Sequence, residues 1–292
     1  MTTQQHTAHP ADSTNYYVPG LSHWPITASV AMALLGFGAA FSMNHMAGGN
    51  VMLILGFIVL FVMFGGWFST VAHESEGGMY NKQVGMSFRW GMSWFIFSEV
   101  MFFGAFFGAL GYMRLYSVPD LGSLEHQALL WPGFKGGWPT AGPHFTPGDF
   151  TPMGAWGIPA INTALLLTSG VTITIAHWGL LKKNRAQLIW GLAATIALGM
   201  IFLGFQIYEY SHAYSEMNLK LTSGAYGSTF FMLTGFHGFH VTVGTIMLWV
   251  ILFRSVAGHF TPENHFGFEG VAWYWHFVDV VWVLLFVLVY IL

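Results

Sequence analysis

The sequence predicts an all-α integral membrane protein with seven transmembrane helices. Its 292 residues are 54% hydrophobic and only 7% charged, whereas a soluble domain is about 25% charged. Seven apolar segments are each long enough for a bilayer crossing, which takes about 20 residues. The 36 glycines and 18% aromatic residues are typical of helices that pack through small side chains and anchor at interfaces with Trp and Tyr.

The apolar segments follow one another with short polar or glycine-rich turns between most of them, such as "NHMAGGN" and "LKKNRAQ". The third segment contains Gly104 and Gly108, whose spacing favours a close helix contact. The predicted crossings are residues 25–44, 51–72, 87–116, 156–180, 187–211, 226–253 and 269–292.

Two stretches lie outside this pattern. Residues 1–22 form a polar tail, which we expect on the cytoplasmic side. The connection over residues 117–155 is rich in Pro, Gly and Trp and has little helical pattern. A long loop of that kind tends to lie over a surface or against a partner. Because no internal repeat is present, residues 23–292 are predicted to form a single seven-helix membrane domain.

The placement of lysine and arginine predicts the orientation, because cytoplasmic loops carry an excess of these residues. Six lie on the side of the N-terminus and three on the opposite side, which predicts a cytoplasmic N-terminus and an outside C-terminus. The net charge of −3 offers no basic surface for nucleic acid, and the absence of Cys excludes disulfides and thiolate metal ligands. The six are Lys82, Arg89, Lys182, Lys183, Arg185 and Arg254, and the three are Arg114, Lys135 and Lys220.

One carboxylate lies deep inside the third predicted crossing. Glu99 is about 15 Å along the helix from Arg89, which places it near the middle of the membrane. An unpaired charge there costs several kcal/mol, so we expect Glu99 to be neutral or paired. His237 and His240 of "GFHGFH" share a helix face at similar depth and are the preferred partners.

His276 and Asp279 of "WYWHFVDVVW" form a second polar group, and three interpretations of all these residues remain open. They can fix helix packing, bind a haem or metal, or handle protons. The second has least support, because the sequence has no HExxH and no carboxylate–histidine repeat of the di-iron type. The residue pattern does not choose between packing and proton handling.

Long stretches of the chain resemble subunit III of the haem–copper cytochrome c oxidases. The C-terminal third carries "AYGSTFFMLTGFHGFHVTVGT" and "NHFGFEGVAWYWHFVDVVW". Upstream, "HWPIT", "RWGMSWFIFSEVMFF" and "INTALLLTSGVTITIAHWGLL" resemble the first, third and fourth helices of that family. The resemblance covers about residues 23–292. It favours the cytochrome c branch, because quinol-oxidase relatives typically lack the first two helices.

The resemblance implies a non-catalytic subunit of a proton-pumping, aa3-type oxidase that reduces O₂ to water in aerobic electron transport. In this family haem and copper are bound by subunits I and II, so no cofactor is expected in this chain. Subunit III flanks subunit I near its proton-uptake channel, sustains proton delivery and protects the complex from inactivation. The expected partners are therefore subunits I and II, with cytochrome c as electron donor to the complex.

The resemblance also implies a shape and two kinds of site. In this family helices 1–2 and 3–7 form a V, and phospholipids fill the cleft. Glu99 falls on the family's carbodiimide-reactive glutamate, whose chemistry requires a protonated carboxyl in an apolar environment. His73 stands where an arginine is usual, and a neutral imidazole lacks the guanidinium fork. The implied lipid-headgroup residues are Trp67, His73, Glu74, Arg254 and His259.

We therefore expect an oxidase subunit III with bound phospholipids in a bacterial inner membrane. Two other functions are alternatives. A proton-coupled secondary transporter could use Glu99 and Asp279, although the sequence lacks the internal repeat and paired broken helices of such proteins. A bis-His haem electron carrier would show a Soret band in the purified chain.

Overall fold

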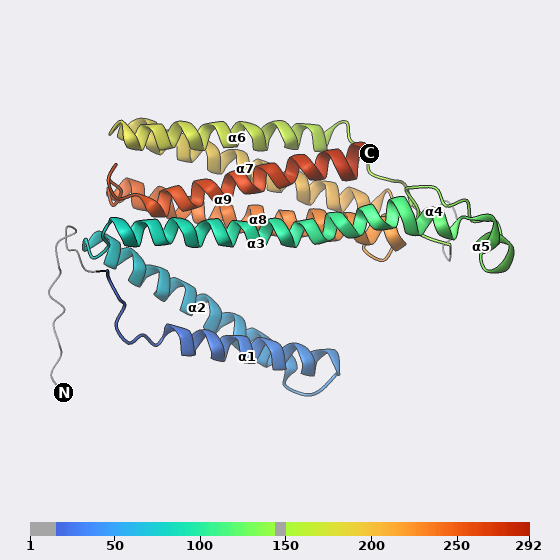
Figure 1. Ribbon diagram of the computed structural model, residues 1–292, viewed down its shortest axis with the longest axis horizontal. Coiled ribbons are helices and arrows are strands. Elements are labelled where there is room, and N and C mark those ends of the chain that lie inside the picture. Colours follow the sequence, from blue (N-terminus) through green and yellow to red (C-terminus); the bar gives the residue numbers. More distant parts are fainter. Residues whose placement is uncertain (1–15, 144–149) are drawn as a thin grey trace. The chain divides into compact units, whose positions relative to one another are not determined.

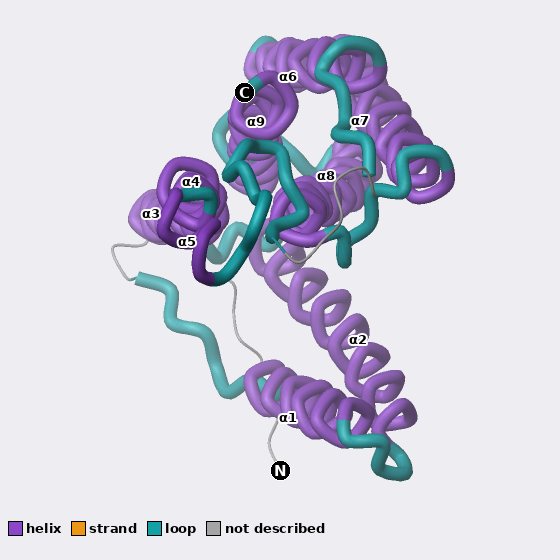
Figure 2. The backbone as a smooth tube through the Cα atoms, turned by 90° about the vertical axis from the view of Figure 1, so that its right-hand side faces the viewer, coloured by secondary structure: helices purple, strands orange, loops and turns teal. Residues whose placement is uncertain are grey.

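A computed structural model describes residues 16–143 and 150–292 of the chain. Most of the predicted tail, residues 1–15, and part of the predicted long loop, residues 144–149, lie outside the described residues. Seven helices are long and apolar enough to cross a membrane, which confirms the predicted number of crossings. The described segments contain helices and loops but no strand (Figure 2).

The helices follow the predicted order along the chain (Figure 1). Several begin or end outside the predicted limits, because the helix continues into polar residues beyond the apolar run. The elements are α1 (Trp24–Met43), α2 (Gly49–Glu76), α3 (Lys82–Tyr112), the π-helix η1 (Met113–Ser117), α4 (Val118–Leu121), α5 (Leu124–Leu129), α6 (Ile158–Leu181), α7 (Arg185–Ser215), α8 (Gly224–Ala257), α9 (Phe266–Leu285) and the π-helix η2 (Phe286–Ile291).

The prediction of an irregular connection over residues 117–155 is wrong at its start. The third crossing runs on without interruption through η1 and α4 to Leu121, and α5 follows. Ser123 caps α5, because its hydroxyl accepts a hydrogen bond from the backbone N–H of His126. Composition did not reveal these turns, because local capping and packing outweigh a weak helical pattern in segments this short.

The chain divides into two compact units, with the boundary in α3 between Phe88 and Arg89. In the first unit, α1 and α2 form an antiparallel hairpin held by close contacts at glycines. A Cβ atom on Gly49 would lie 2.4 Å from the backbone nitrogen of Ser42, and one on Gly66 would collide with the Trp24 ring. The small residues therefore set the spacing of this hairpin, as is usual for membrane helices.

In the second unit, α6–α9 pack around a core of large aromatic and aliphatic side chains. Trp275 and Trp282 of α9 are fully buried there. Each indole N–H donates to a hydroxyl on α6, Trp275 to Ser169 at 2.8 Å and Trp282 to Thr163 at 2.9 Å. The two bonds fix the register of α9 against α6 and satisfy the polar end of each indole.

The part of α3 that belongs to the second unit meets α8 and α9 through long side chains. Phe102 packs edge-to-face on Phe236 of α8, with ring centroids 5.0 Å apart, and Phe103 lies 6.1 Å from Phe277 of α9. The predicted helix contact at Gly104 and Gly108 is wrong for the described chain, because no heavy atom would lie within 4 Å of a Cβ at either position.

Candidate functional site

Glu99 lies beside His240, as the depth argument predicted. Its Oε2 is 2.9 Å from His240 Nε2, and the two side chains are 22% and 10% exposed. Glu99 of α3 therefore lies at the edge of the contact with α8 and is less buried than the sequence suggested. The short separation satisfies the polar end of both side chains across two helices.

The other ring nitrogen of His240 determines what this contact can do. Nδ1 lies 2.6 Å from the carbonyl oxygen of Phe236. A carbonyl only accepts, so Nδ1 carries a hydrogen, and one further proton is shared between Nε2 and Glu99. Whether that proton is on the carboxyl or on the imidazole, the two groups together carry no net charge. Such a pairing is compatible with an apolar environment.

Aromatic rings surround the Glu99–His240 contact. The His240 ring lies 5.1 Å from Phe103 and 6.3 Å from both Phe277 and Tyr274, measured between ring centroids. These rings come from α3 and α9, and they hold the imidazole in place between the two helices. The contact is thus a polar link inside an aromatic layer.

His237 does not join Glu99. It is buried, and its Nε2 lies 3.2 Å from the backbone carbonyl of Val278 on α9. Its ring lies between Phe202 and Trp282, at 5.7 and 5.0 Å. Three residues along a helix turn the side chain by about 60°, so His237 and His240 contact different neighbours although they share a broad face.

His276 and Asp279 form a second polar link, between α9 and α6. His276 Nδ1 is 3.7 Å from Asp279 Oδ2, and His276 Nε2 is 3.3 Å from Thr174 Oγ1. A Cβ on Gly170 would lie 2.3 Å from Asp279 Oδ2, so the carboxyl occupies the space that glycine leaves. The five predicted intramembrane residues thus form separate contacts and not one site.

A third carboxylate, Glu209 of α7, also links two helical segments. Glu209, towards the end of its crossing, is 1% exposed and accepts a 2.6 Å hydrogen bond from the Tyr290 hydroxyl. Tyr290 lies in η2, where i→i+5 bonding replaces α-helical bonding. Sequence reasoning missed this contact. An available signal was Gln206, which stands one turn before Glu209 on an otherwise apolar helix face.

The predicted lipid-headgroup residues of the first unit lie at the end of α2. Glu74 accepts hydrogen bonds from Tyr17 at 2.9 Å and from Tyr80 at 2.6 Å. Burial, and then the neighbouring Glu74, raise the pKa of both tyrosines, so both phenols stay protonated as donors. Trp67 is 44% exposed, and His73 Nδ1 donates to the Ser69 carbonyl at 2.7 Å.

The remaining two headgroup candidates follow α8 in the second unit. The Arg254 guanidinium lies over the Phe260 ring, 4.7 Å from its centroid, and the His259 backbone N–H donates to the Arg254 carbonyl at 3.0 Å. Nearby on α3 and α9, Arg89 and Glu269 form a salt bridge of 2.8 Å. Arg89 is therefore engaged in joining helices and is not only an interfacial anchor.

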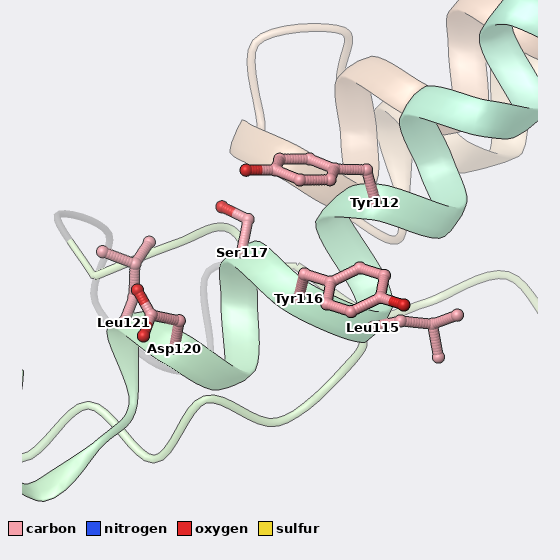
Figure 3. Close-up of a pocket in the computed structure, with 6 residues that line it drawn as sticks. All are labelled: Tyr112, Leu115, Tyr116, Ser117, Asp120 and Leu121. Carbon is pink, nitrogen blue, oxygen red and sulfur yellow. The ribbon is translucent and has the colours of Figure 1, made fainter.

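A shallow pocket of about 390 Å³ lies at the end of the third crossing (Figure 3). It is formed by η1, α4 and the last residue of α3, and none of the predicted site residues lines it. Its lining is Tyr112, Leu115, Tyr116, Ser117, Asp120 and Leu121.

These features define a multi-pass helical membrane protein in which ionisable side chains link neighbouring helices. Within residues 16–143 and 150–292, no group of three or more His, Cys, Asp or Glu side chains is placed to hold a metal ion. The ionisable residues instead occur as pairs on facing helices or one turn apart.

Comparison with known proteins identifies the family. Residues 14–292 match the family "Cytochrome c oxidase subunit III", and the chain belongs to it. Similar proteins include cytochrome c oxidase subunit 3 of Prototheca wickerhamii, 41% identical over 92% of this chain and 94% of the relative. The same subunit of Cyprinus carpio is 40% identical over 94% of this chain and 96% of its own length.

Membership makes the chain a component of an oxidase complex that contains other subunits. This supports the accessory-subunit prediction over the transporter and the bis-His haem carrier.

Proposed function

We propose that this chain flanks subunit I of the oxidase and sustains proton delivery to it, while subunits I and II bind the haem and copper. The Glu99–His240 contact carries this proposal, because it joins two ionisable side chains of α3 and α8 within helices that are apolar enough to cross a membrane. We further propose cytochrome c as the electron donor. We propose a bacterial inner membrane as the location of this chain, and the six-to-three distribution of lysine and arginine supports a cytoplasmic N-terminus.

Removing this chain from the complex should leave the haem and copper spectra unchanged and the initial rate of electron transfer high. The rate should then fall during turnover, and fall faster at high pH, where protons are scarce. Oxygen consumption recorded over many turnovers at several pH values measures this. Immediate loss of part of the optical spectrum would contradict the proposal, because the chain would then bind a redox centre.

Glu99→Gln tests the role of this residue separately from the role of the whole subunit. Glutamine keeps the shape and hydrogen bonds of a neutral carboxyl but cannot release a proton. We expect the variant to assemble with full metal content and to lose only a modest part of its activity. If Glu99→Gln abolished oxygen reduction outright, Glu99 would be an obligatory proton carrier, and its packing role would be secondary.

We also propose that phospholipid binds in a cleft between the first two membrane crossings, α1 and α2, and the other five, α3 and α6–α9. The headgroup residues would be Trp67, His73, Glu74, Arg254 and His259. An exposed tryptophan at the end of α2 and a cation at the end of α8 support this, since such residues anchor at membrane interfaces. Glu74 would act through Tyr17 and Tyr80, whose hydroxyls already occupy its two oxygens.

Arg254→Gln should reduce the phospholipid that the purified complex retains. One cation near an anionic lipid contributes about 1 kcal/mol, so affinity should fall about five-fold. Lipid mass spectrometry after a graded detergent wash measures the retained amount. Lys183→Gln is the control, because it removes a charge from the turn between α6 and α7, outside the proposed headgroup set. Equal lipid loss in both variants would indicate a general charge effect and contradict this site.

A further inference from the structure

A group of buried polar side chains lies on α6, α7 and η2 and takes no part in the Glu99–His240 contact. Its members are Asn162, Gln206, Glu209 and Tyr290, which are 0%, 5%, 1% and 7% exposed. Four polar side chains of this kind are unexpected in the interior of an apolar bundle, because buried polar groups need partners.

The register of the helices brings Asn162 to the level of Gln206, about one helical turn from Glu209. Three contacts keep α6 and α7 in constant antiparallel register, and this register places Asn162 opposite the residue before Gln206. Trp282 contacts both helices close by, because its ring packs on Phe202 at 4.8 Å while its N–H bonds Thr163. The three contacts are Thr172–Thr195, Ala176–Gly191 and Gly179–Leu188.

Only part of the hydrogen-bonding capacity of this cluster is used by protein atoms. Tyr290 donates to Glu209 Oε1 at 2.6 Å, and the Gln206 carboxamide lies next to Tyr290 but outside hydrogen-bond geometry. Both carboxamide atoms of Asn162, both of Gln206 and Glu209 Oε2 are buried without a hydrogen-bond partner among the described residues. The unused set therefore contains carboxamide N–H donors as well as oxygen acceptors.

We propose that Asn162, Gln206, Glu209 and Tyr290 form a binding site for internal water. Water both donates and accepts, so it can satisfy the carboxamide N–H groups and the oxygens together. A bare cation would satisfy only the oxygens and leave both NH₂ groups unpartnered. Buried water is ordinary in proteins of this size, at about one molecule per 27 residues.

The site gives Glu209 a specific role. His212, the neighbouring histidine on α7, is paired with Glu216 at 3.2 Å, and no salt bridge to Glu209 occurs in the described part of the chain. An uncompensated carboxylate inside the bundle is costly, so Glu209 holds its proton on Oε2 and donates it to the water. Tyr290 meanwhile donates to the other oxygen, and the water links α6, α7 and η2.

The test is a cryo-EM map of the intact oxidase complex at a resolution that shows ordered water. We expect a density peak within hydrogen-bond distance of both Asn162 and Glu209. Glu209→Gln should keep this peak, because an amide still donates and accepts, whereas Asn162→Leu should lose it. The wild-type map decides by itself if the leucine variant does not assemble.

Two results would overturn the proposal. In the first, Asn162 and Gln206 are bonded to protein atoms, with no density between them and Glu209. In the second, the peak has only oxygen neighbours at about 2.4 Å, a distance typical of a cation such as Ca²⁺ and too short for water.

Discussion

Replacing Glu99 with leucine is expected to lower the unfolding free energy of the chain by about 1–3 kcal/mol, because His240 Nε2 would lose its partner inside an aromatic layer. Glu99→Gln should cost much less, because the amide can still bond Nε2. Thermal dissociation of this subunit from the purified complex measures the difference. The 2.9 Å contact is the reason for expecting an effect at a residue that is only partly buried.

A double-mutant cycle distinguishes this contact from general packing. If Glu99→Leu lowers the unfolding free energy because it leaves His240 without a hydrogen-bond partner, then adding His240→Leu should restore part of the stability. The coupling energy should be about 0.5–3 kcal/mol, as for side chains in direct contact. Strictly additive effects would show that the two side chains do not support each other.

The second large effect is expected at Gly244. A Cβ there would lie 2.9 Å from the Trp275 ring, and one on Gly199 would lie 2.8 Å from the same ring. The ring cannot move aside easily, because it is fully buried and its N–H bonds Ser169. Gly244→Val should therefore destabilise the chain by about 1–3 kcal/mol, the usual cost of overfilling a packed core.

Gly104→Ala is the matched control for Gly244→Val. No atom would meet its Cβ within 4 Å, and alanine favours a helix over glycine by about 0.5–1 kcal/mol. We expect unchanged or slightly higher thermal stability, measured on the same purified complex. If Gly244→Val proved as harmless as Gly104→Ala, Trp275 would not be confined between its two glycines.

The sequence was sufficient for the crossings but not for the arrangement of side chains between them. Hydropathy located all seven helices, because the bilayer imposes their length. Depth along the helix also indicated that Glu99 would meet the histidines of "GFHGFH", and His240 does so. Depth could not distinguish His237 from His240 as the partner. The helix that each histidine faces depends on lateral packing, and a single sequence carries no information on lateral packing.

The Glu209–Tyr290 contact was missed for the same reason. It joins α7 to the last turns of the chain, 81 residues later, and only the register of three packed helices brings the two together. The start of the long loop was missed for a different reason. Segments as short as α4 and α5 are decided by capping and tertiary contacts more than by composition.

The neutral pairing of Glu99 with His240 limits how the membrane potential can act on it. A proton that passes from one side chain to the other moves within a 2.9 Å contact. This is about one tenth of a hydrocarbon layer roughly 30 Å thick. A full crossing is worth about 2.3 kcal/mol per 100 mV, so the transfer feels at most about 0.2 kcal/mol per 100 mV. Voltage therefore has almost no influence on which residue holds the proton.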